Sequence, residues 1–269
     1  MTTPICFLSD FGLQDEFVGV VKGVLHRIAP ESAVIDITHQ IPAGDVRAGA
    51  LALTRAIQYL PAGVVLAVVD PGVGTERRAL AAATDHGVFI GPDNGLLSPA
   101  VAMVGGALSV HSIENPEARI PAPGATFHGR DIFAPAAGLV ASGEATLEEL
   151  GPELDPNTLV PMMLPLPKLD PPLIVGEAWW VDLFGNIETN VGPEEMELLG
   201  LRPGDEVEVR VGATWHIGRW VTTYGEVEEG ALAVHVDSAG LMALAVRGAR
   251  ADEGLSLTTG MAVTFRVPD

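Results

Sequence analysis

The chain is poor in cysteine and has no long hydrophobic run. Its one cysteine, Cys6, lies in the apolar run Ile5-Cys6-Phe7-Leu8 and cannot form an internal disulfide, so we interpret it as a small buried side chain without a redox role. A membrane-spanning helix needs about 18 apolar residues in succession, and no such run is present. The start Met1-Thr2-Thr3-Pro4 lacks the basic residues of a signal peptide. We therefore expect a cytoplasmic protein without a membrane partner.

Positive charge is also scarce. The 269 residues include 15 Lys and Arg against 35 Asp and Glu, which gives a formal net charge of -20. This balance repels a phosphate backbone and argues against nucleic acid as a partner. A cationic ligand would be tolerated, although an acidic surface also serves solubility alone. Apolar residues make up 48% of the chain, which is ample for a core, and the length allows one or two domains.

The amino-terminal part of the chain alternates strand-like and helix-like patterns. Apolar runs typical of strands buried in a parallel sheet lie at 5–8, 33–37 and 64–69. Between them, apolar residues recur every three or four positions over 17–28 and 46–60, which predicts two helices. Strands alternating with helices imply right-handed crossovers, with ligands beyond the carboxyl ends of the strands. Asp10 and Asp70 stand at two such ends.

Further elements follow in the same half. The runs 79–84 and 87–90 flank an Asp/Gly turn and predict a hairpin. Asp131 is placed to N-cap a helix that continues through Ala141, and a short helix is expected at 145–150.

The carboxyl-terminal part has a different texture. Five prolines between 159 and 172 favour a linker without regular structure. Beyond it, strand-like runs lie at 173–183, 206–211, 214–221, 232–237 and 261–267, separated by Gly, Pro and Asp. We predict an α/β protein whose N-terminal α/β domain, 1–160, has a mainly parallel sheet. A linker, 161–172, then leads to a smaller antiparallel β-barrel domain, 173–269.

The segment from Val69 to Gly74 joins an acid at a strand end to a glycine-rich turn. Pro71 holds Asp70 extended, and the glycines permit positive φ, so backbone NH groups and one carboxylate can point at the same spot. The segment lacks the Gly-Lys-Ser/Thr of a P-loop and the third glycine of a dinucleotide fingerprint. By itself it would be a strand-exit turn with a capping aspartate.

Arg77 and His128 are the candidates to join Asp70. Arg77 and Arg78 are expected to begin the next strand, where neighbouring side chains point to opposite faces, and we favour Arg77 as the one that faces the site. His128 precedes Gly129 where a loop runs into a helix. A surface cation and a structural histidine are the ordinary alternatives. Together the three residues are suited to hold and activate a small anion, which indicates an enzyme.

Two other clusters suit a nucleoside. Asp10 could accept two hydrogen bonds from a ribose diol, whereas nearby Asp15 is better explained as a helix cap. Asp182, Phe184 and Asn186 offer an aromatic face and an amide edge to a purine, or simply form a polar β-turn.

A metal site of mixed histidine and carboxylate ligands is a minority alternative. No HxxxH, HxH or CxxC spacing supports it. Its possible ligands are Asp10, Asp36, His39, Asp70, His128 and Asp131.

Five motifs follow one another along the chain. They are Ser9-Asp10-Phe11-Gly12, Val69-Asp70-Pro71-Gly72-Val73-Gly74-Thr75 with Arg77, Gly91-Pro92-Asp93-Asn94-Gly95-Leu96-Leu97, Phe127-His128-Gly129-Arg130-Asp131-Ile132-Phe133 and Asp182-Leu183-Phe184-Gly185-Asn186-Ile187-Glu188-Thr189-Asn190. In this order they resemble the S-adenosylmethionine (SAM) hydrolases, also called SAM hydroxide adenosyltransferases. The SAM-dependent fluorinase and chlorinase belong to the same superfamily and deliver a halide in place of hydroxide.

The resemblance implies a fold, an assembly and a reaction. The fold is an α/β domain followed by a β-barrel, and the assembly is a homotrimer whose active sites lie between the N-domain of one subunit and the C-domain of the next. The reaction converts SAM and water to adenosine and L-methionine. SAM is the substrate, so no cofactor and no metal are expected.

The resemblance also assigns residues. It places the hydroxide-activating set on Asp70, Arg77 and His128, and ribose recognition on Asp10. Recognition of adenine or methionine falls on Asp182, Phe184 and Asn186, and on the segment 238–249, which includes Ser238, Arg247 and Ala249.

Two features favour a hydrolase over a halogenase. The fluorinase has an aromatic residue in the place of Asp70 and an extra loop in its N-domain that this chain lacks. A carboxylate would repel a halide but can accept a hydrogen bond from water. One departure weakens the assignments near Ser238, because the segment 237–243 lacks the aromatic and acidic residues expected after the serine. A non-catalytic protein that binds adenosine or SAM is the alternative from another class.

Overall fold

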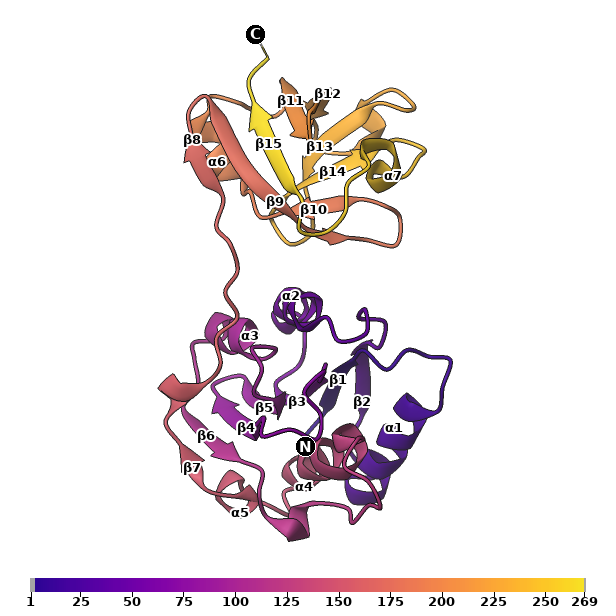
Figure 1. Cartoon of the computed structure of the whole chain (residues 1–269), viewed down its shortest axis with the longest axis vertical. Helices are drawn as coiled ribbons and strands as arrows, with labels where there is room; N and C mark the ends of the chain where they lie inside the picture. The colour runs from indigo at the N-terminus through magenta and orange to yellow at the C-terminus, as the bar shows by residue number, and fades with distance from the viewer. Residues whose placement is uncertain (1–2, 269) are drawn as a thin grey trace. The chain divides into compact units, whose positions relative to one another are not determined.

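A seven-stranded sheet is the centre of the first of two units, Met1–Met162 and Met163–Asp269, in the computed structural model, which describes residues 3–268 (Figure 1). The strand order is β2-β1-β3-β5-β4-β6-β7. The first four strands are parallel, and the last three extend the sheet in antiparallel fashion. The strands are β1 (Ile5–Ser9), β2 (Val34–Thr38), β3 (Gly63–Val68), β4 (Ala79–Thr84), β5 (Gly87–Pro92), β6 (Ser109–Ser112) and β7 (Glu153–Leu154). The predicted parallel strands and the hairpin of β4 and β5 are confirmed.

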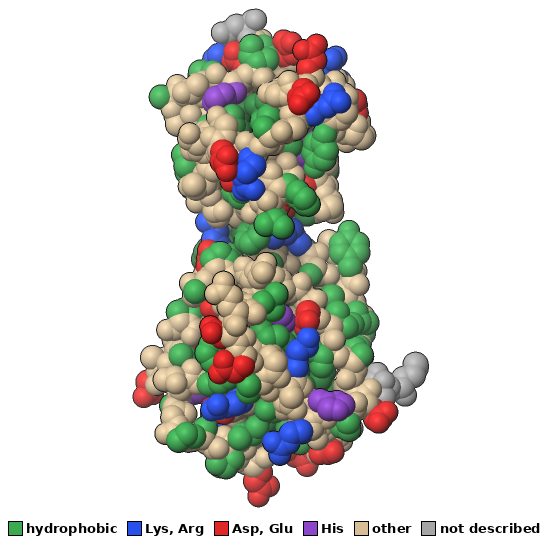
Figure 2. Space-filling model, turned by 90° about the vertical axis from the view of Figure 1, so that its right-hand side faces the viewer, with side chains coloured by type: hydrophobic (Ala, Val, Ile, Leu, Met, Phe, Trp, Pro, Cys, Tyr) green, Lys and Arg blue, Asp and Glu red, His purple; other side chains and the backbone are tan. Residues whose placement is uncertain are grey.

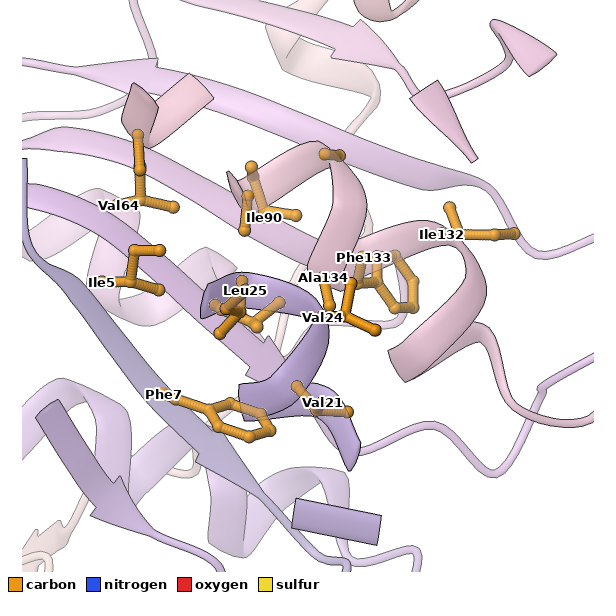
Figure 3. Close-up of a cluster of buried hydrophobic side chains, with 14 of the residues drawn as sticks. Ile5, Phe7, Val21, Val24, Leu25, Val64, Ile90, Ile132, Phe133 and Ala134 are labelled. Carbon is orange, nitrogen blue, oxygen red and sulfur yellow. The ribbon is translucent and has the colours of Figure 1, made fainter. Parts of the chain in front are cut away.

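The two amphipathic helices form where the apolar spacing predicts them. They are α1 (Phe17–Ile28) and α2 (Val46–Ile57), and the Asp45 carboxylate caps α2 by accepting a hydrogen bond from the Ala48 N–H at 2.9 Å. Helix α1 packs against α4 (Ala134–Ser142), and α2 packs against α3 (Ser98–Met103). Figure 3 shows the apolar face of α1 in contact with buried side chains of the sheet and of the segment before α4.

The order of the first three strands places a topological switch point at their carboxyl ends, which we call the crevice. The chain leaves β1 to form β2 on one side and returns to form β3 on the other side, with Ser9 opposite Val68. A reversal of this kind opens a ligand-binding crevice in α/β sheets. Asp10 and Asp70 directly follow β1 and the end of the β3 run, so both belong to this crevice.

The helix after His128 begins earlier than the sequence indicates. A π-helical turn, η2 (Gly129–Phe133), leads directly into α4, and Gly143 ends α4 with a φ of 76°. The prediction that Asp131 is the N-cap was wrong, because Asp131 lies inside the π turn and its carboxylate binds the Arg130 guanidinium. The remaining short helices of this unit are η1 (Pro116–Ala118), α5 (Leu147–Leu150) and η3 (Pro156–Thr158).

The second unit is a closed barrel of seven strands. The order β9-β15-β11-β12-β13-β14-β10 closes where β10 pairs with β9, and β8 adds to the outside of β9. The strands are β8 (Lys168–Asp170), β9 (Leu173–Val181), β10 (Ile187–Thr189), β11 (Glu206–Val211), β12 (Thr214–Trp220), β13 (Leu232–Val236), β14 (Met242–Val246) and β15 (Ala262–Arg266). The helices are α6 (Pro193–Leu198), η4 (Tyr224–Glu226) and α7 (Ala251–Leu255).

Three details of the barrel differ from expectation. Strand β8 lies inside the segment predicted to have no regular structure. Strands β10 and β14 were not predicted, and β12 pairs with β13 in parallel, whereas the other pairs of the barrel are antiparallel.

On the face shown in Figure 2, acidic and basic side chains are scattered among apolar and neutral ones, without a continuous basic patch. Across residues 3–268, none of the helices has the length and apolar character that crossing a bilayer requires.

Candidate active site

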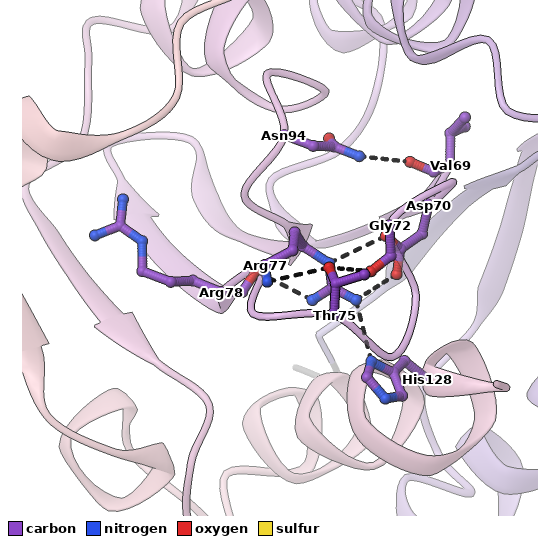
Figure 4. Close-up of polar contacts among 8 residues, drawn as sticks. All are labelled: Val69, Asp70, Gly72, Thr75, Arg77, Arg78, Asn94 and His128. Atoms are coloured by element: carbon purple, nitrogen blue, oxygen red, sulfur yellow. Dashed lines mark hydrogen bonds and ion pairs between the residues drawn. The ribbon is translucent and has the colours of Figure 1, made fainter. Parts of the chain in front are cut away.

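Asp70 and Arg77 form a bidentate ion pair at the crevice (Figure 4). The Arg77 Nε–H donates to Asp70 Oδ1 at 3.0 Å, and Nη2 donates to Oδ2. The two side chains are 6% and 8% exposed, so water screens their interaction weakly. Arg77 also lies against the Phe133 ring, 5.2 Å from its centroid, and its Nη1 donates to the Arg78 carbonyl at 3.1 Å. The guanidinium is therefore fixed in its plane.

His128 completes the cluster through the same guanidinium. Arg77 Nη2 lies 3.1 Å from His128 Nδ1. A guanidinium can only donate, so Nδ1 accepts and the proton of the neutral ring is on Nε2. Partial burial, and then the Arg77 cation, lower the pKa of His128 below its usual value. The ring is held neutral, with an N–H group on the side away from Arg77.

The turn from Asp70 to Arg77 depends on its glycines and on Thr75. Gly74 has a φ of 80°, which a residue with a side chain adopts at a cost. The Thr75 hydroxyl donates to the Gly72 carbonyl at 2.7 Å, and the Val73 N–H donates to the Asp70 carbonyl at 3.2 Å. These bonds bring Arg77 back over the strand end that carries Asp70.

Arg78 contacts a different part of the unit from Arg77, in agreement with the prediction that the two side chains point in different directions. Its Nε donates to Asp93 Oδ2 at 2.8 Å, and its Nη1 donates to the Thr158 hydroxyl at 3.1 Å. The other Asp93 oxygen accepts from the Val160 N–H at 2.9 Å. Both arginines precede β4, which begins at Ala79, so neither lies in the strand as expected.

Asp10 lies at the neighbouring strand end. Its Oδ2 accepts a hydrogen bond from the Gly44 N–H at 2.8 Å. Burial raises the pKa of Asp10, the Gly44 bond opposes this, and the negative charge of Asp70 raises it further. The Asp10 carboxylate therefore lies within the electrostatic influence of Asp70.

A pocket of about 330 Å³ reaches Arg77 and His128 in the first unit. Its wall includes Arg119 and Glu114, which the sequence did not single out. The Arg119 cation also lowers the pKa of His128, after burial and Arg77. No motif or periodicity marks Arg119, because its place depends on the loop that precedes η2.

A second pocket, of about 720 Å³, lies in the barrel unit. It is lined by Asp182, Phe184, Asn186, Tyr224, Ala245, Val246, Arg247, Gly248, Ala249 and Arg250. The predicted Asp182, Phe184, Asn186, Arg247 and Ala249 therefore come together. Ser238 does not join them, because it lies in the exposed turn between β13 and β14.

Asp182 stabilises the turn that lines this pocket. Its carboxylate accepts from the backbone N–H groups of Phe184 and Asn186, each at 2.8 Å, and from the Asn186 amide at 2.8 Å. Arg250 donates to the Leu183 carbonyl at 2.8 Å and supports the same turn. The turn leaves Phe184 76% exposed beside the pocket.

The side chains proposed for a metal site bind other partners. Asp36 contacts Lys22, Asp70 contacts Arg77 and Asp131 contacts Arg130. Among residues 3–268, no three His, Cys, Asp or Glu side chains are grouped so as to hold a metal ion.

The match to known proteins covers both units. Residues 5–151 match the SAM hydroxide adenosyltransferase N-terminal domain, and residues 176–264 match the C-terminal domain of the same name. The chain belongs to the SAM hydroxide adenosyltransferase family.

Particular relatives span nearly the whole chain. A protein of Thermus thermophilus named (R)-S-adenosyl-L-methionine hydrolase is 46% identical over 97% of this chain and 98% of its own. One of Salinispora tropica with the same name is 45% identical over 95% of each chain. The crystal structure of an uncharacterized conserved protein from Thermotoga maritima superposes with a TM-score of 0.90 at 37% identity, over 97% of this chain and 99% of that one. A fluorinase of Nocardia brasiliensis is more distant, at 27% identity over 98% of this chain and 96% of its own.

Proposed function

We propose that the protein hydrolyses SAM to adenosine and L-methionine by attack of an activated water or hydroxide on ribose C5′. The observation that carries the proposal is the Arg77 guanidinium, which contacts both Asp70 and His128. Membership of the family, and the names of relatives at 45% and 46% identity, support the choice of substrate and reaction.

The contacts give Asp70 and His128 different roles. His128 Nδ1 accepts from Arg77, so its Nε2–H is a donor that stabilises negative charge on the attacking oxygen. The Asp70 carboxylate is an acceptor, and it orients the water and draws its proton as the C–O bond forms. Arg77 holds the two groups together and adds positive charge near the developing hydroxide.

The leaving group needs no acid. Methionine departs as a neutral thioether when the C5′–S bond breaks, while one proton of the water stays on the 5′-hydroxyl and the other passes to solvent. SAM carries a sulfonium charge, so each turnover releases one proton. Water is a poor nucleophile, with a pKa of about 15.7. Stabilising hydroxide is therefore the main task of the site.

We propose that Asp10 binds the ribose diol and that the barrel pocket receives the base or the methionine end. Asp10 lies at the same crevice as Asp70. Phe184, exposed at the rim of the pocket, offers a face on which a purine can stack. The ribose would then lie beside the nucleophile, as in-line attack requires.

We also propose the assembly and compartment that the sequence suggested. The active form is a homotrimer in which the first unit of one subunit meets the barrel of the next, so sedimentation is expected to give three times the monomer mass of 28.1 kDa. A cytoplasmic location fits the single buried cysteine.

The test is a product analysis. Purified protein is incubated with SAM, with and without chloride or fluoride, and adenosine, halogenated nucleoside and methionine are separated by chromatography. We expect adenosine and methionine in equal amounts without halide, together with one proton per turnover. Because the relatives are named for the (R) form, both sulfonium epimers are assayed separately.

Two results would reject hydrolysis. A halogenated nucleoside formed only with halide would make the protein a halogenase. Stoichiometric binding of SAM or adenosine without methionine release would make it a binding protein.

A further inference from the structure

The loops that follow β1 and β2 are joined by a buried pair of polar side chains. The Ser9 hydroxyl lies 2.8 Å from His39 Nδ1, and the two residues are 0% and 4% exposed. The Gly12 N–H donates to the His39 carbonyl at 2.7 Å. The His39 ring packs 4.5 Å from the ring of Phe7. The proposed catalytic set contains neither Ser9 nor His39.

The direction of the hydrogen bonds can be worked out. Ser9 Oγ accepts weakly from the Phe11 N–H at 3.4 Å, so its own hydrogen can point to His39 Nδ1. The proton of His39 is then on Nε2, which lies 3.2 Å from Asp36 Oδ1 but is poorly aligned for a hydrogen bond. Although partial burial opposes it, Lys22 and His39 lower the pKa of Asp36. Ser9, His39 and Asp36 therefore form a chain from the crevice to the surface.

Asp10 is held close to both loops that the Ser9–His39 pair joins. It follows Ser9 directly, and its Oδ2 binds the Gly44 N–H, which belongs to the loop after His39. Three contacts thus set the distance between the two loops: the Ser9–His39 bond, the Gly12–His39 bond and the Asp10–Gly44 bond. A carboxylate held from both sides meets a ligand without reorganising.

Apolar side chains would fill the same buried space at a lower desolvation cost. A hydroxyl and an imidazole set the separation of two loops more sharply, because hydrogen bonds depend on direction and distance. A sharply defined separation of the two loops matters most where one of them carries a carboxylate that binds a ligand.

We propose that Ser9 and His39 are positioning residues that hold Asp10 ready for the ribose diol and so select ribose over 2′-deoxyribose. This inference rests on the proposed function. Neither residue touches the substrate. Their effect is carried by the loop that bears Asp10.

Two substitutions of His39 separate its two contacts. In H39N the amide replaces Nδ1 and keeps a partner for Ser9, whereas in H39Q the amide replaces Nε2 and keeps only the side facing Asp36. S9A removes the hydroxyl with little change in volume. The readout is the ratio of kcat/KM for SAM to kcat/KM for its 2′-deoxyribose analogue, which does not depend on the fraction of protein that is folded.

We expect S9A and H39Q to reduce this ratio about tenfold, as for a lost hydrogen bond to a charged group, mainly through KM. H39N is expected to stay within about twofold of the wild-type ratio. In a D10A background S9A should have no further effect, because the group that it positions is gone. Equal losses for the two substrates, or an S9A effect that persists in D10A, would overturn the inference.

Calorimetry with adenosine and 2′-deoxyadenosine keeps the inference testable if SAM is not turned over. The wild type should bind adenosine more tightly, and S9A should lose most of that preference. A wild type that binds the two nucleosides equally overturns the role of Ser9 and His39, whatever the reaction is. A preference for adenosine that S9A abolishes, without methionine release, rejects only the proposed function.

Discussion

The Arg77 guanidinium influences how His128 responds to pH. The cation repels a second positive charge on the ring, and protonation of Nδ1 would break the contact at 3.1 Å. Both effects favour the neutral imidazole. In the unfolded chain the ring titrates near its ordinary pKa of about 6.5. Below that pH the unfolded state binds the proton first, so His128 makes the fold less stable as the pH falls.

A pH profile should show this shift. We expect the acidic limb of kcat/KM, and the NMR titration of His128, to have a midpoint below about 6.5, because the neutral ring persists to lower pH. R77Q removes the Arg77 cation and should move the titration of His128 to higher pH.

Arg78 supplies the control for this measurement. It is adjacent in sequence but is paired with Asp93. R78Q should therefore leave the His128 midpoint where it is in the wild type. An equal shift in R77Q and R78Q would show that the effect comes from net charge and not from the contact.

Asp70 is the residue whose loss should separate binding from chemistry. D70N keeps the shape of the side chain but replaces the carboxylate that accepts from water, so we expect kcat to fall by about 10² to 10⁴ and SAM binding to change little. Single-turnover kinetics and calorimetry on the same preparation measure the two quantities. Unchanged turnover would remove Asp70 from the mechanism.

At the level of elements, the start of η2 depends on a residue without a side chain. A Cβ at Gly129 would lie 2.8 Å from Phe11 Cζ and 3.4 Å from Phe127 Cε2. Those rings belong to an edge-to-face cluster in which Phe11 and Phe127 are 5.7 Å apart. His128 is the neighbour of Gly129, so a shift of the backbone that relieves this crowding would also displace the imidazole.

G129A is therefore expected to lower the free energy of unfolding by about 1 to 3 kcal/mol, as overpacking does, and to reduce kcat. Gly19 and Gly23 in α1 are matched controls, because a Cβ at either would meet no atom within 4 Å. G19A and G23A should raise stability by about 0.5 to 1 kcal/mol each. Chemical denaturation of the three variants gives the comparison, and G129A as stable as G19A would contradict the packing argument.

Elements with a long apolar period could be predicted, and short ones could not. Helices α1 and α2 repeat their apolar residues over 12 positions each, and the β4–β5 hairpin carries its own turn signal. Strand β10 has only 3 residues and directly follows a polar turn, so it has no pattern to read. The true start of η2 was missed because the Asp131 carboxylate binds Arg130 instead of the backbone.

The candidate site was predictable only in part, because some of its contacts join residues that are far apart in the sequence. Asp10 and Asp70 follow from strand ends in a parallel sheet, which is a local argument combined with a topological one. His128 lies 51 residues from Arg77, and their contact depends on the whole first unit. The sequence grouped the three residues by their chemistry, and the family resemblance assigned them the same role, but neither gave the geometry of their contacts. The Ser9–His39 pair has no sequence signal beyond its two strand ends.

For the whole molecule, each unit carries one part of the proposed site. The first has Asp70, Arg77 and His128, and the barrel has the pocket beside Phe184. If the protein is the proposed homotrimer and its sites form between subunits, defects in different units can complement each other. A mixed trimer of D70N and F184A subunits would contain a site with an intact first unit and an intact barrel.

We expect co-expressed D70N and F184A subunits, isolated as mixed trimers by two different tags, to recover a substantial part of the activity that each variant lacks alone. A mixture of D70N with H128A should recover none, because every first unit is then defective. Failure of the D70N and F184A mixture would show that each subunit completes its own site.

The adjacent arginines before β4 have a consequence for how this chain can change. Arg77 reaches Asp70, while Arg78 reaches Asp93 and the stretch at 158–160. Losing or gaining one residue between Thr75 and Arg78 would displace both arginines, so the contacts with Asp70 and with Asp93 would be lost in a single event. The number of residues in this turn is therefore constrained in addition to its glycines and Thr75.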